Sequence, residues 1–326
     1  MALSISIQEV RSTLERHYTT VPGYFLQDDS DTVAETFDFT QYSFGLKNRS
    51  VQGEKTQWQN FGDEVQQLNE KSASDVQYKV LFLGRHGQGW HNVAEHMYGT
   101  ESWDCYWSKL EGNGIMQWAD ATLTNQGIKQ AELVNQFWTS MIKLEKIPTP
   151  QKYYTSPLDR CCATAKISFS GIDLPSDRPF TPIIKELLRE VNGVHTCDRR
   201  SSKTCIHNTY PDYTIEEGFA ENDELWEADE RESNSALDAR LKKLLDDIFE
   251  HDDSTFISLT SHSGSIASLL RVLGHRPFRL VTGSVIPVLV KSEKKFEPPN
   301  SGEIEPPIKP PVCNFTEGQA LTPNEN

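Results

Sequence analysis

Three short motifs in the chain carry side chains that can bind and attack a phosphate group. Residues 85–87 (Arg-His-Gly), 156–160 (Ser-Pro-Leu-Asp-Arg) and 261–264 (Ser-His-Ser-Gly) each follow a short strand-like run of the chain. In mostly parallel α/β sheets, ligand sites lie beyond the carboxyl ends of the strands. We therefore expect the three motifs to meet at one edge of a sheet, where each contributes a guanidinium group or an imidazole ring.

The side chains in these motifs match what a phosphate ester requires. A phosphate monoester is close to a dianion and binds best to planar guanidinium forks, which Arg85 and Arg160 can supply. An imidazole with one neutral nitrogen, such as that of His86, can attack phosphorus and form a phosphohistidine, which divides one difficult displacement into two easier ones. His262 can donate to the phosphoryl oxygens as charge spreads over them in the transition state. The sequence thus predicts a phosphate pocket around His86.

The elements that must position these motifs follow from the spacing of apolar residues. Apolar runs predict strands at 78–83, 153–155 and 256–260, and apolar residues every three or four positions predict helices at 124–142, 158–168, 236–248 and 266–273. Thr124 is a suitable residue to begin a helix, and Gly274 is suited to end one. Strands that alternate with helices predict an α/β fold, a three-layer α/β/α sandwich with a mostly parallel sheet.

Composition divides the chain into three parts. Residues 1–75 are polar and weakly periodic, so we expect an N-terminal extension packed on the core. Residues 76–292 hold all three motifs and form the predicted catalytic domain. Residues 293–326 contain seven prolines and few large apolar side chains. Because such a segment buries little apolar surface, we expect a disordered tail.

The order of the three motifs resembles the histidine phosphatase (phosphoglycerate mutase-like) superfamily. Longer stretches resemble the fungal phosphomutase-like PMU proteins and related plant sequences: 85–93 (RHGQGWHNV), 104–107 (DCYW), 187–199 (LLREVNGVHTCDR) and 223–226 (DELW). The resemblance spans roughly residues 76–292. It implies a phosphoglycerate mutase-like fold and a phosphohistidine intermediate.

The resemblance also implies roles for single residues. His86 would be the nucleophile, and the phosphate pocket would be formed by Arg85, Arg160 and His262. Asn92 would add a further polar contact, and Glu190 would donate the proton to the leaving oxygen. A carboxyl group near two arginines is normally ionised, so an acid role for Glu190 requires burial, which the apolar neighbours Leu188 and Val191 make possible. Alternatively, Glu186 and Glu190 are solvated carboxylates on one helix face.

Two sets of polar residues have both a functional and a structural interpretation. One set could bind zinc: His195, Cys197, Cys205 and His207. The spacing of one residue within each pair is unlike common zinc sites, and we expect no metal. The other set could contact a second phosphate: Arg199, Arg200 and Lys203. These cations are alternatively a solvated face paired with the acidic stretch at 216–232.

A dense group of aromatic residues also allows two interpretations. Its members lie within one short stretch: Trp90, Tyr98, Trp103, Tyr106 and Trp107. Their rings could stack against a flat leaving group such as a nucleotide base. Alternatively, they form the core of a lid or of the domain itself.

Composition restricts the partners and the location. The formal net charge of −15, without a Lys/Arg-rich stripe, disfavours nucleic acid as a partner. The longest apolar runs are far shorter than the ~20 residues of a membrane-spanning helix, and the N-terminus lacks a secretory pattern. We therefore expect a soluble protein of the cytoplasm or nucleus, without a membrane partner. Six irregularly spaced cysteines predict mostly reduced thiols.

One function is preferred and two alternatives stay open. We expect a phosphomonoesterase that needs no metal or cofactor and acts on small phosphorylated metabolites, such as nucleotides, sugar phosphates or phytate-like intermediates. Small substrates are favoured because a local cluster of cations must act against the overall negative charge. The alternatives are a phosphoglycerate mutase-like intramolecular phosphotransferase and a catalytically silent phosphate-binding or scaffold domain. The oligomeric state is left open.

Overall fold

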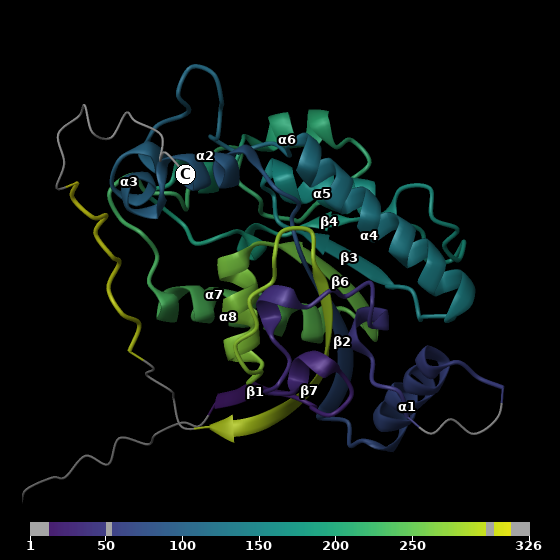
Figure 1. Ribbon diagram of the computed structural model, residues 1–326. Helices are drawn as coiled ribbons and strands as arrows, with labels where there is room; N and C mark the ends of the chain where they lie inside the picture. The colour runs from purple at the N-terminus through teal and green to yellow at the C-terminus, as the bar shows by residue number, and fades with distance from the viewer. Residues whose placement is uncertain (1–12, 50–53, 298–302, 314–326) are drawn as a thin grey trace, which may run out of the picture.

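The computed structural model describes residues 13–49, 54–297 and 303–313, which contain one seven-stranded sheet (Figure 1). The strand order is β1-β7-β2-β6-β3-β4-β5. The strands are β1 (Thr13–Thr20), β2 (Val76–Arg85), β3 (Lys152–Thr155), β4 (Ile183–Ile184), β5 (Thr214–Ile215), β6 (Phe256–Ser261) and β7 (Val285–Glu297). The five strands from β2 to β5 in this order run parallel, whereas β7 and β1 are antiparallel to their neighbours. This confirms the prediction of a mostly parallel sheet.

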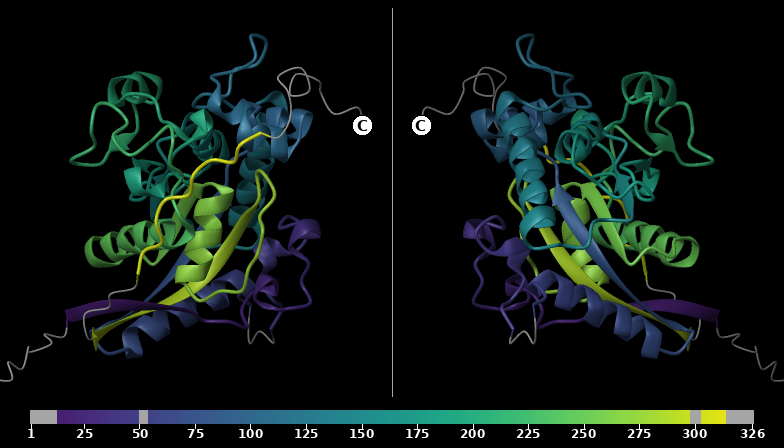
Figure 2. Two further views of the ribbon diagram at one scale, coloured as in Figure 1. Left: turned by 90° about the vertical axis from the view of Figure 1, so that its left-hand side faces the viewer. Right: turned by 90° about the vertical axis from the view of Figure 1, so that its right-hand side faces the viewer.

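Helices cover both faces of the sheet. Figure 2 shows α4 (Asn125–Leu144) in front of the sheet in one view and α8 (Ser263–Val272) in front of it in the opposite view. Next to α4 packs α5 (Asp159–Phe169), and next to α8 packs α7 (Asn234–His251). The fold is therefore the predicted three-layer α/β/α sandwich. No helix of the described residues combines the length and apolar character that a bilayer span requires.

Shorter elements connect these layers. The other α-helices of the described residues are α1 (Gln57–Lys71), α2 (Trp90–Tyr98), α3 (Thr100–Cys105) and α6 (Lys203–Thr209). Single 3₁₀ turns occur at η1 (Leu26–Asp28), η2 (Ala34–Thr36), η3 (Ser43–Gly45), η4 (Trp107–Lys109), η5 (Glu186–Leu188) and η6 (Thr196–Asp198). Most of these turns lie in the long connections that lead into and away from the motifs.

The elements that position the motifs form where apolar spacing predicts them. In β2, all four side chains of residues 80–83 are completely buried. At the start of α4, the Oγ1 of Thr124 accepts a hydrogen bond of 3.1 Å from the amide of Gly127. Val134 and Trp138, four residues apart on α4, are buried against the sheet. These contacts fix the strand that ends in the first motif and the helix that packs beside it.

The N-terminal region is a structural part of the domain. Strand β1 pairs with β7 along its whole length and becomes an edge of the sheet. Phe25, Phe44 and Trp58 are completely buried in the main core. The segment thus contributes an edge strand to the sheet and aromatic residues that complete the main core. Residues 1–12 and 50–53 of the predicted extension lie outside the described residues.

The described part of the C-terminal tail is ordered, which corrects the expectation of disorder there. Strand β7 continues to Glu297, and residues 303–313 extend along the molecule toward α3 (Figure 1). The backbone of Ile308 exchanges two hydrogen bonds of 2.8 Å with Arg231, and Cys313 forms a disulfide with Cys105. Backbone pairing and a covalent bond thus replace the apolar burial that this segment lacks. The other four cysteines are free, so the prediction of mostly reduced thiols holds with the exception of Cys105 and Cys313. The predicted disorder of residues 298–302 and 314–326 concerns residues outside the described ones.

Candidate active site

The three motifs meet at the carboxyl ends of three neighbouring parallel strands. Arg85 ends β2 and lies opposite Ser261 of β6. The amide of His86 donates to the carbonyl of Ser261, and the amide of Ser156 donates to that of Thr260, both over 3.0 Å. Because the order of the strands is β2-β6-β3, the third motif lies between the other two. Sequence spacing alone predicted this edge as the site.

His86 is placed as a neutral ring with one free lone pair. Its side chain is 1% exposed, and its Nδ1 lies 2.7 Å from the carbonyl oxygen of Gly87. Since a carbonyl oxygen can only accept, Nδ1 carries the proton and Nε2 keeps its lone pair. Burial, and then the charges of Arg160 and Arg85, hold the pKa of His86 well below its usual value. A neutral imidazole with an unprotonated Nε2 is the form that can attack phosphorus.

The loop that carries His86 is fixed by a close backbone approach. The amide of Gly87 donates to the Oγ1 of Thr164 over 3.0 Å. A Cβ atom on Gly87 would lie 2.3 Å from the carbonyl oxygen of Gly127 in α4. Only glycine fits this contact, which explains why glycine follows the histidine in the first motif.

His262 lies directly beside His86. The two ring centroids are 5.1 Å apart, and His262 is completely buried at the N-cap of α8. Its Nε2 is in hydrogen-bond contact with the Oγ of Ser156 over 2.7 Å. Burial, and then the charge of Arg160, hold the pKa of His262 well below its usual value. The ring is therefore neutral and able to donate one N–H.

The two predicted guanidinium groups also lie at this edge. Arg160, in the first turn of α5, is 1% exposed. Its Nη1 donates to the carbonyl of Cys197 over 2.5 Å, and its Nη2 donates to Asp198 over 3.0 Å. Arg85 is partly buried, and its Nη1 donates to the carbonyl of Leu280 over 2.8 Å. Within the described residues, the buried Nε atoms of both arginines have no hydrogen-bond partner. Two positively charged groups, each with an unpaired N–H donor, are suited to bind an anion.

A third histidine, His91, belongs to the site and was missed by sequence reasoning. Its ring centroid is 5.3 Å from that of His86, and the side chain is 9% exposed. Burial, and then the charge of Arg160, hold the pKa of His91 well below its usual value. The signal was present: Gly89 and Asn92 form the start of α2, which places residue 91 in a first helical turn close to His86.

Asn92 and Glu190 each accept hydrogen bonds from backbone amides at the start of a helix. The Oδ1 of Asn92 accepts the amide of Gly89 over 3.0 Å and caps α2, while the residue lines a pocket of about 540 Å³ together with Arg85. The carboxyl group of Glu190 accepts hydrogen bonds at the N-terminus of α8, from the amides of Gly264 (3.0 Å) and Ser265 (3.1 Å). It also accepts bonds from the amide of residue 191 and the hydroxyl of residue 263. Glu190 thereby anchors the helix whose N-cap is His262.

The four residues with a possible zinc pattern do not come together. His195 and Cys197 cluster with Asp198, whereas Cys205 is exposed and, like His207, lies on α6 outside this cluster. Arg160 and Arg231 both bind Asp198, and their positive charges disfavour a metal cation at this position.

The other two candidate sets are mainly structural. Arg199 pairs with Glu111 on the surface, and Arg200 is buried against Glu186. Of the aromatic group, three rings are buried in a second core cluster: Tyr98, Trp103 and Trp107. Tyr106 packs against this cluster, and Trp90 is 37% exposed at a separate pocket of about 430 Å³. Arg199 and Arg200 are therefore paired cations, but their ion-pair partners lie outside the acidic stretch at 216–232, and Arg200 is buried rather than solvated. For the aromatic group packing is favoured, with Trp90 left as a candidate for contact with a leaving group.

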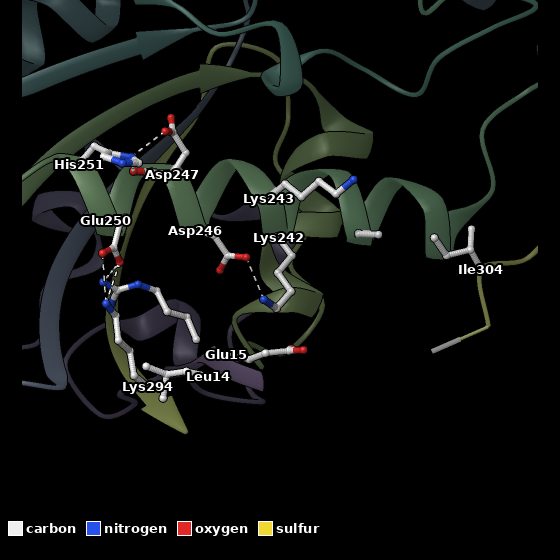
Figure 3. A pocket seen from close by; sticks show the side chains of 12 residues that line it. Leu14, Glu15, Lys242, Lys243, Asp246, Asp247, Glu250, His251, Lys294 and Ile304 are labelled. Atoms are coloured by element: carbon white, nitrogen blue, oxygen red, sulfur yellow. Dashed lines mark hydrogen bonds and ion pairs between the residues drawn. The ribbon is translucent and has the colours of Figure 1, made fainter. Parts of the chain in front are cut away.

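A large surface hollow of about 770 Å³ lies away from the site, between β1 and α7 (Figure 3). Its charged side chains are largely paired with one another, as in Lys242–Asp246, His251–Asp247 and the pairs that Glu250 makes. None of the predicted catalytic residues lines it. Size alone therefore does not indicate the active site.

Known proteins similar to this chain share one family. A family described as "Histidine phosphatase superfamily (branch 1)" matches residues 81–284. The chain is 54% identical over 300 residues to a "Probable phosphoglycerate mutase" of Arthroderma benhamiae, which covers 90% of this chain and 89% of that protein. It is 34% identical over 290 residues to "Probable phosphoglycerate mutase PMU1" of Saccharomyces cerevisiae, and this match covers 83% of this chain and 95% of that protein. A solved structure, a putative alpha-ribazole-5'-P phosphatase from Escherichia coli, is 18% identical with a TM-score of 0.39, covering 65% and 94%. The family match includes all three motifs.

Proposed function

Because the chain belongs to the histidine phosphatase superfamily and is related to a fungal PMU protein, as its motifs predicted, we propose that it is a phosphomonoesterase. The observation that carries the proposal is the buried cluster of side chains around His86. There, a neutral imidazole lies near two arginines whose buried Nε atoms have no partner among the described residues. Such a cluster supplies a nucleophile and unsatisfied donors for a phosphoryl group.

The proposed reaction has two transfers. In the first, the lone pair of His86 Nε2 attacks phosphorus, an N–P bond forms, and the ester P–O bond breaks as the leaving oxygen takes a proton. In the second, water attacks the phosphohistidine, the N–P bond breaks, and inorganic phosphate leaves with His86 restored. Arg85 and Arg160 hold the phosphoryl oxygens, and the N–H of His262 stabilises their growing charge in the transition state. The charge that a metal would supply is thus provided by guanidinium groups.

Glu190 is the proposed donor of the proton to the leaving oxygen. Glu190 lies close to Arg85. Burial lowers the pKa of Arg85, and the charge of Glu190 opposes this effect. Its anchoring to α8 holds it in place for such a transfer.

A mutase is the second candidate, and one observation favours it. Two relatives carry the name probable phosphoglycerate mutase, and the match to this chain covers 89% and 95% of their lengths. A mutase must retain the phosphohistidine and return the phosphoryl group to a different oxygen of the same substrate. We prefer hydrolysis because it needs only the groups already named, whereas a mutase must also rebind an intermediate in a second orientation.

The proposed substrates are small phosphorylated metabolites. The pocket donors are few and local, whereas the chain as a whole carries a net charge of −15. A polyanion would meet this negative field, and a small monoester meets mainly the pocket. We propose the cytoplasm or nucleus as the location.

Release of inorganic phosphate from a panel of monoesters, measured with EDTA present, tests this function. We expect turnover by the wild type and a loss on the order of a thousandfold or more in His86→Ala, since transfer then has no covalent route. His207→Ala, on a helix away from the pocket, is the matched control and should retain activity. Interconversion of phosphoglycerates without release of phosphate would establish the mutase instead.

A further inference from the structure

Asp198 is a buried carboxylate held at both oxygens. It lies in η6 and is 3% exposed. Its Oδ1 accepts a hydrogen bond from Arg160 over 3.0 Å, and its Oδ2 accepts one from Arg231 over 3.1 Å. His195 Nδ1 lies 3.9 Å from the same Oδ2. Because both oxygens are engaged, the carboxylate cannot rotate away from Arg160 without losing its other partner.

The charges around Asp198 favour its ionised form. Burial alone raises the pKa of a carboxyl group, but the charges of Arg231 and Arg160 outweigh burial, so that the pKa of Asp198 lies below its usual value. In return, burial lowers the pKa of Arg160, but the charge of Asp198 and smaller contributions from nearby groups together outweigh burial and raise the pKa of that guanidinium. The ion pair is thus formed at every pH at which a phosphate ester is a dianion.

The geometry of the guanidinium group separates two possible roles for this pair. Arg160 has five N–H donors in one plane. Nη1 donates to the carbonyl of Cys197, and Nη2 donates to the carboxylate of Asp198. Both nitrogens lie at the end of the guanidinium fork. The Nε donor is buried and has no partner among the described residues. Asp198 therefore holds the end of the fork and leaves its side edge available for two phosphate oxygens.

We propose that Asp198 is a positioning residue, which orients Arg160 so that the Nε edge of its guanidinium faces the phosphoryl group. This inference rests on the proposed function, in which Arg160 binds the phosphoryl group. A competing role is autoinhibition, in which Asp198 occupies the place of the phosphate on Arg160. The unpartnered Nε favours positioning, because an inhibitory carboxylate would cover the free edge.

Arg231 connects this ion pair to the ordered tail. Its Nη1 donates to the carbonyl of Gly193 over 2.6 Å, and its backbone pairs with Ile308. Arg231 is therefore fixed by two backbone segments, and it fixes the Oδ2 of Asp198 in turn. The arrangement places a rigid outer support behind Asp198 rather than a mobile surface cation.

Three substitutions at one position test the proposal. Asp198→Ala removes the carboxylate that binds Arg160. We expect kcat/KM for 4-nitrophenyl phosphate to fall about hundredfold, because small displacements of binding groups have effects of this size. Asp198→Asn keeps an acceptor for Arg160 and should recover most of the loss. Asp198→Glu keeps the charge but shifts it by one methylene, so kcat/KM should fall at least severalfold. Glu250→Gln, which removes the partner of the buried Arg16 away from the site, is the matched control and should leave kcat/KM unchanged.

Binding of inorganic phosphate, measured by calorimetry, gives a readout that does not need turnover. Positioning predicts weaker phosphate binding in Asp198→Ala than in the wild type and near-normal binding in Asp198→Asn. Unchanged or tighter binding in Asp198→Ala would overturn the proposal, and tighter binding would establish autoinhibition. If Asp198→Ala does not fold, unchanged phosphate binding in Asp198→Glu overturns it equally. A wild type that binds phosphate but hydrolyses no ester would contradict the proposed function alone.

Discussion

The rings of His86 and His262 lie side by side, with centroids 5.1 Å apart and an interplanar angle of 60°. They follow β2 and β6, which are adjacent parallel strands, so the pairing is set by the register of the sheet. Two protonated imidazoles at this distance would repel each other. Burial, and then the guanidinium charges, lower the pKa of both rings, so both are neutral. The positive charge beside the two rings is thereby carried by guanidinium groups, among them Arg85 and Arg160.

The first prediction concerns stability at acidic pH. The pKa of His86, His91 and His262 is lowered mainly by burial in the folded protein, and the unfolded chain has the ordinary value near 6.5. The unfolded state therefore binds more protons below about pH 6.5, and the free energy of unfolding falls as pH falls. Each ring contributes up to about 1 kcal/mol per pH unit. Urea unfolding at pH 7.5, 6.5 and 5.5 measures this slope.

A variant identifies the groups responsible for that slope. His91→Asn should reduce the loss of stability between pH 6.5 and 5.5. His207→Gln, on α6 outside the buried cluster, should leave it unchanged. An equal slope in the wild type and in His91→Asn would show that folding does not lower the pKa of His91.

The second prediction compares two glycines near the end of the same strand. In Gly87→Ala, the new Cβ would lie 2.3 Å from the carbonyl oxygen of Gly127, so the loop must move away from α4. We expect the free energy of unfolding to fall by about 2 to 3 kcal/mol. We also expect kcat to fall at least tenfold, because the backbone of His86 shifts with the loop. In Gly84→Ala the nearest atom is 3.6 Å away, an ordinary contact, and both quantities should stay close to the wild type.

Much of this fold could be predicted because its decisive patterns are local. The apolar run at 78–83 and the threonine cap at Thr124 correspond directly to β2 and to the start of α4. The α1 helix also carries a helical pattern, with Trp58, Phe61 and Val65 buried, but polar residues around it obscured the signal. Edge strand β1 is mostly polar, and its pairing with β7 depends on a partner far along the chain.

The parts of the site that were not predicted depend on distant contacts. Asp198 gains its role from Arg160, 38 positions away, and no spacing rule connects the two. Cys105 and Cys313 are separated by 208 positions, so their irregular spacing in the sequence gave no indication of a pair. The three motifs were found because strand ends of a parallel sheet converge by topology, whatever the length of chain between them.

The third prediction concerns the Cys105–Cys313 disulfide. Because the bridge closes a very long loop, its loss in Cys313→Ser should lower the free energy of unfolding by about 2 to 4 kcal/mol. Wild type treated with a reductant should behave in the same way. Cys205→Ser, which removes an exposed free thiol, should have no effect. Alkylation of Cys105 and Cys313 in the untreated, folded protein would contradict the bridge. Since such bonds persist mainly in oxidising compartments, the location of the protein decides whether the tail stays attached.

The fourth prediction separates the two roles of Glu190. Glu190→Gln keeps the size of the side chain, but it removes the proton donor and replaces one acceptor oxygen at the N-terminus of α8. Proton donation matters most when the leaving oxygen is a poor leaving group. We therefore expect kcat to fall about hundredfold for an alkyl phosphate and less than tenfold for 4-nitrophenyl phosphate, whose leaving group needs no proton. If the residue only anchors α8 and His262, kcat should fall by the same factor for both esters. Ser265→Ala is the matched control, because it keeps the amide that binds Glu190 and removes only the hydroxyl that donates to the carbonyl of Arg189.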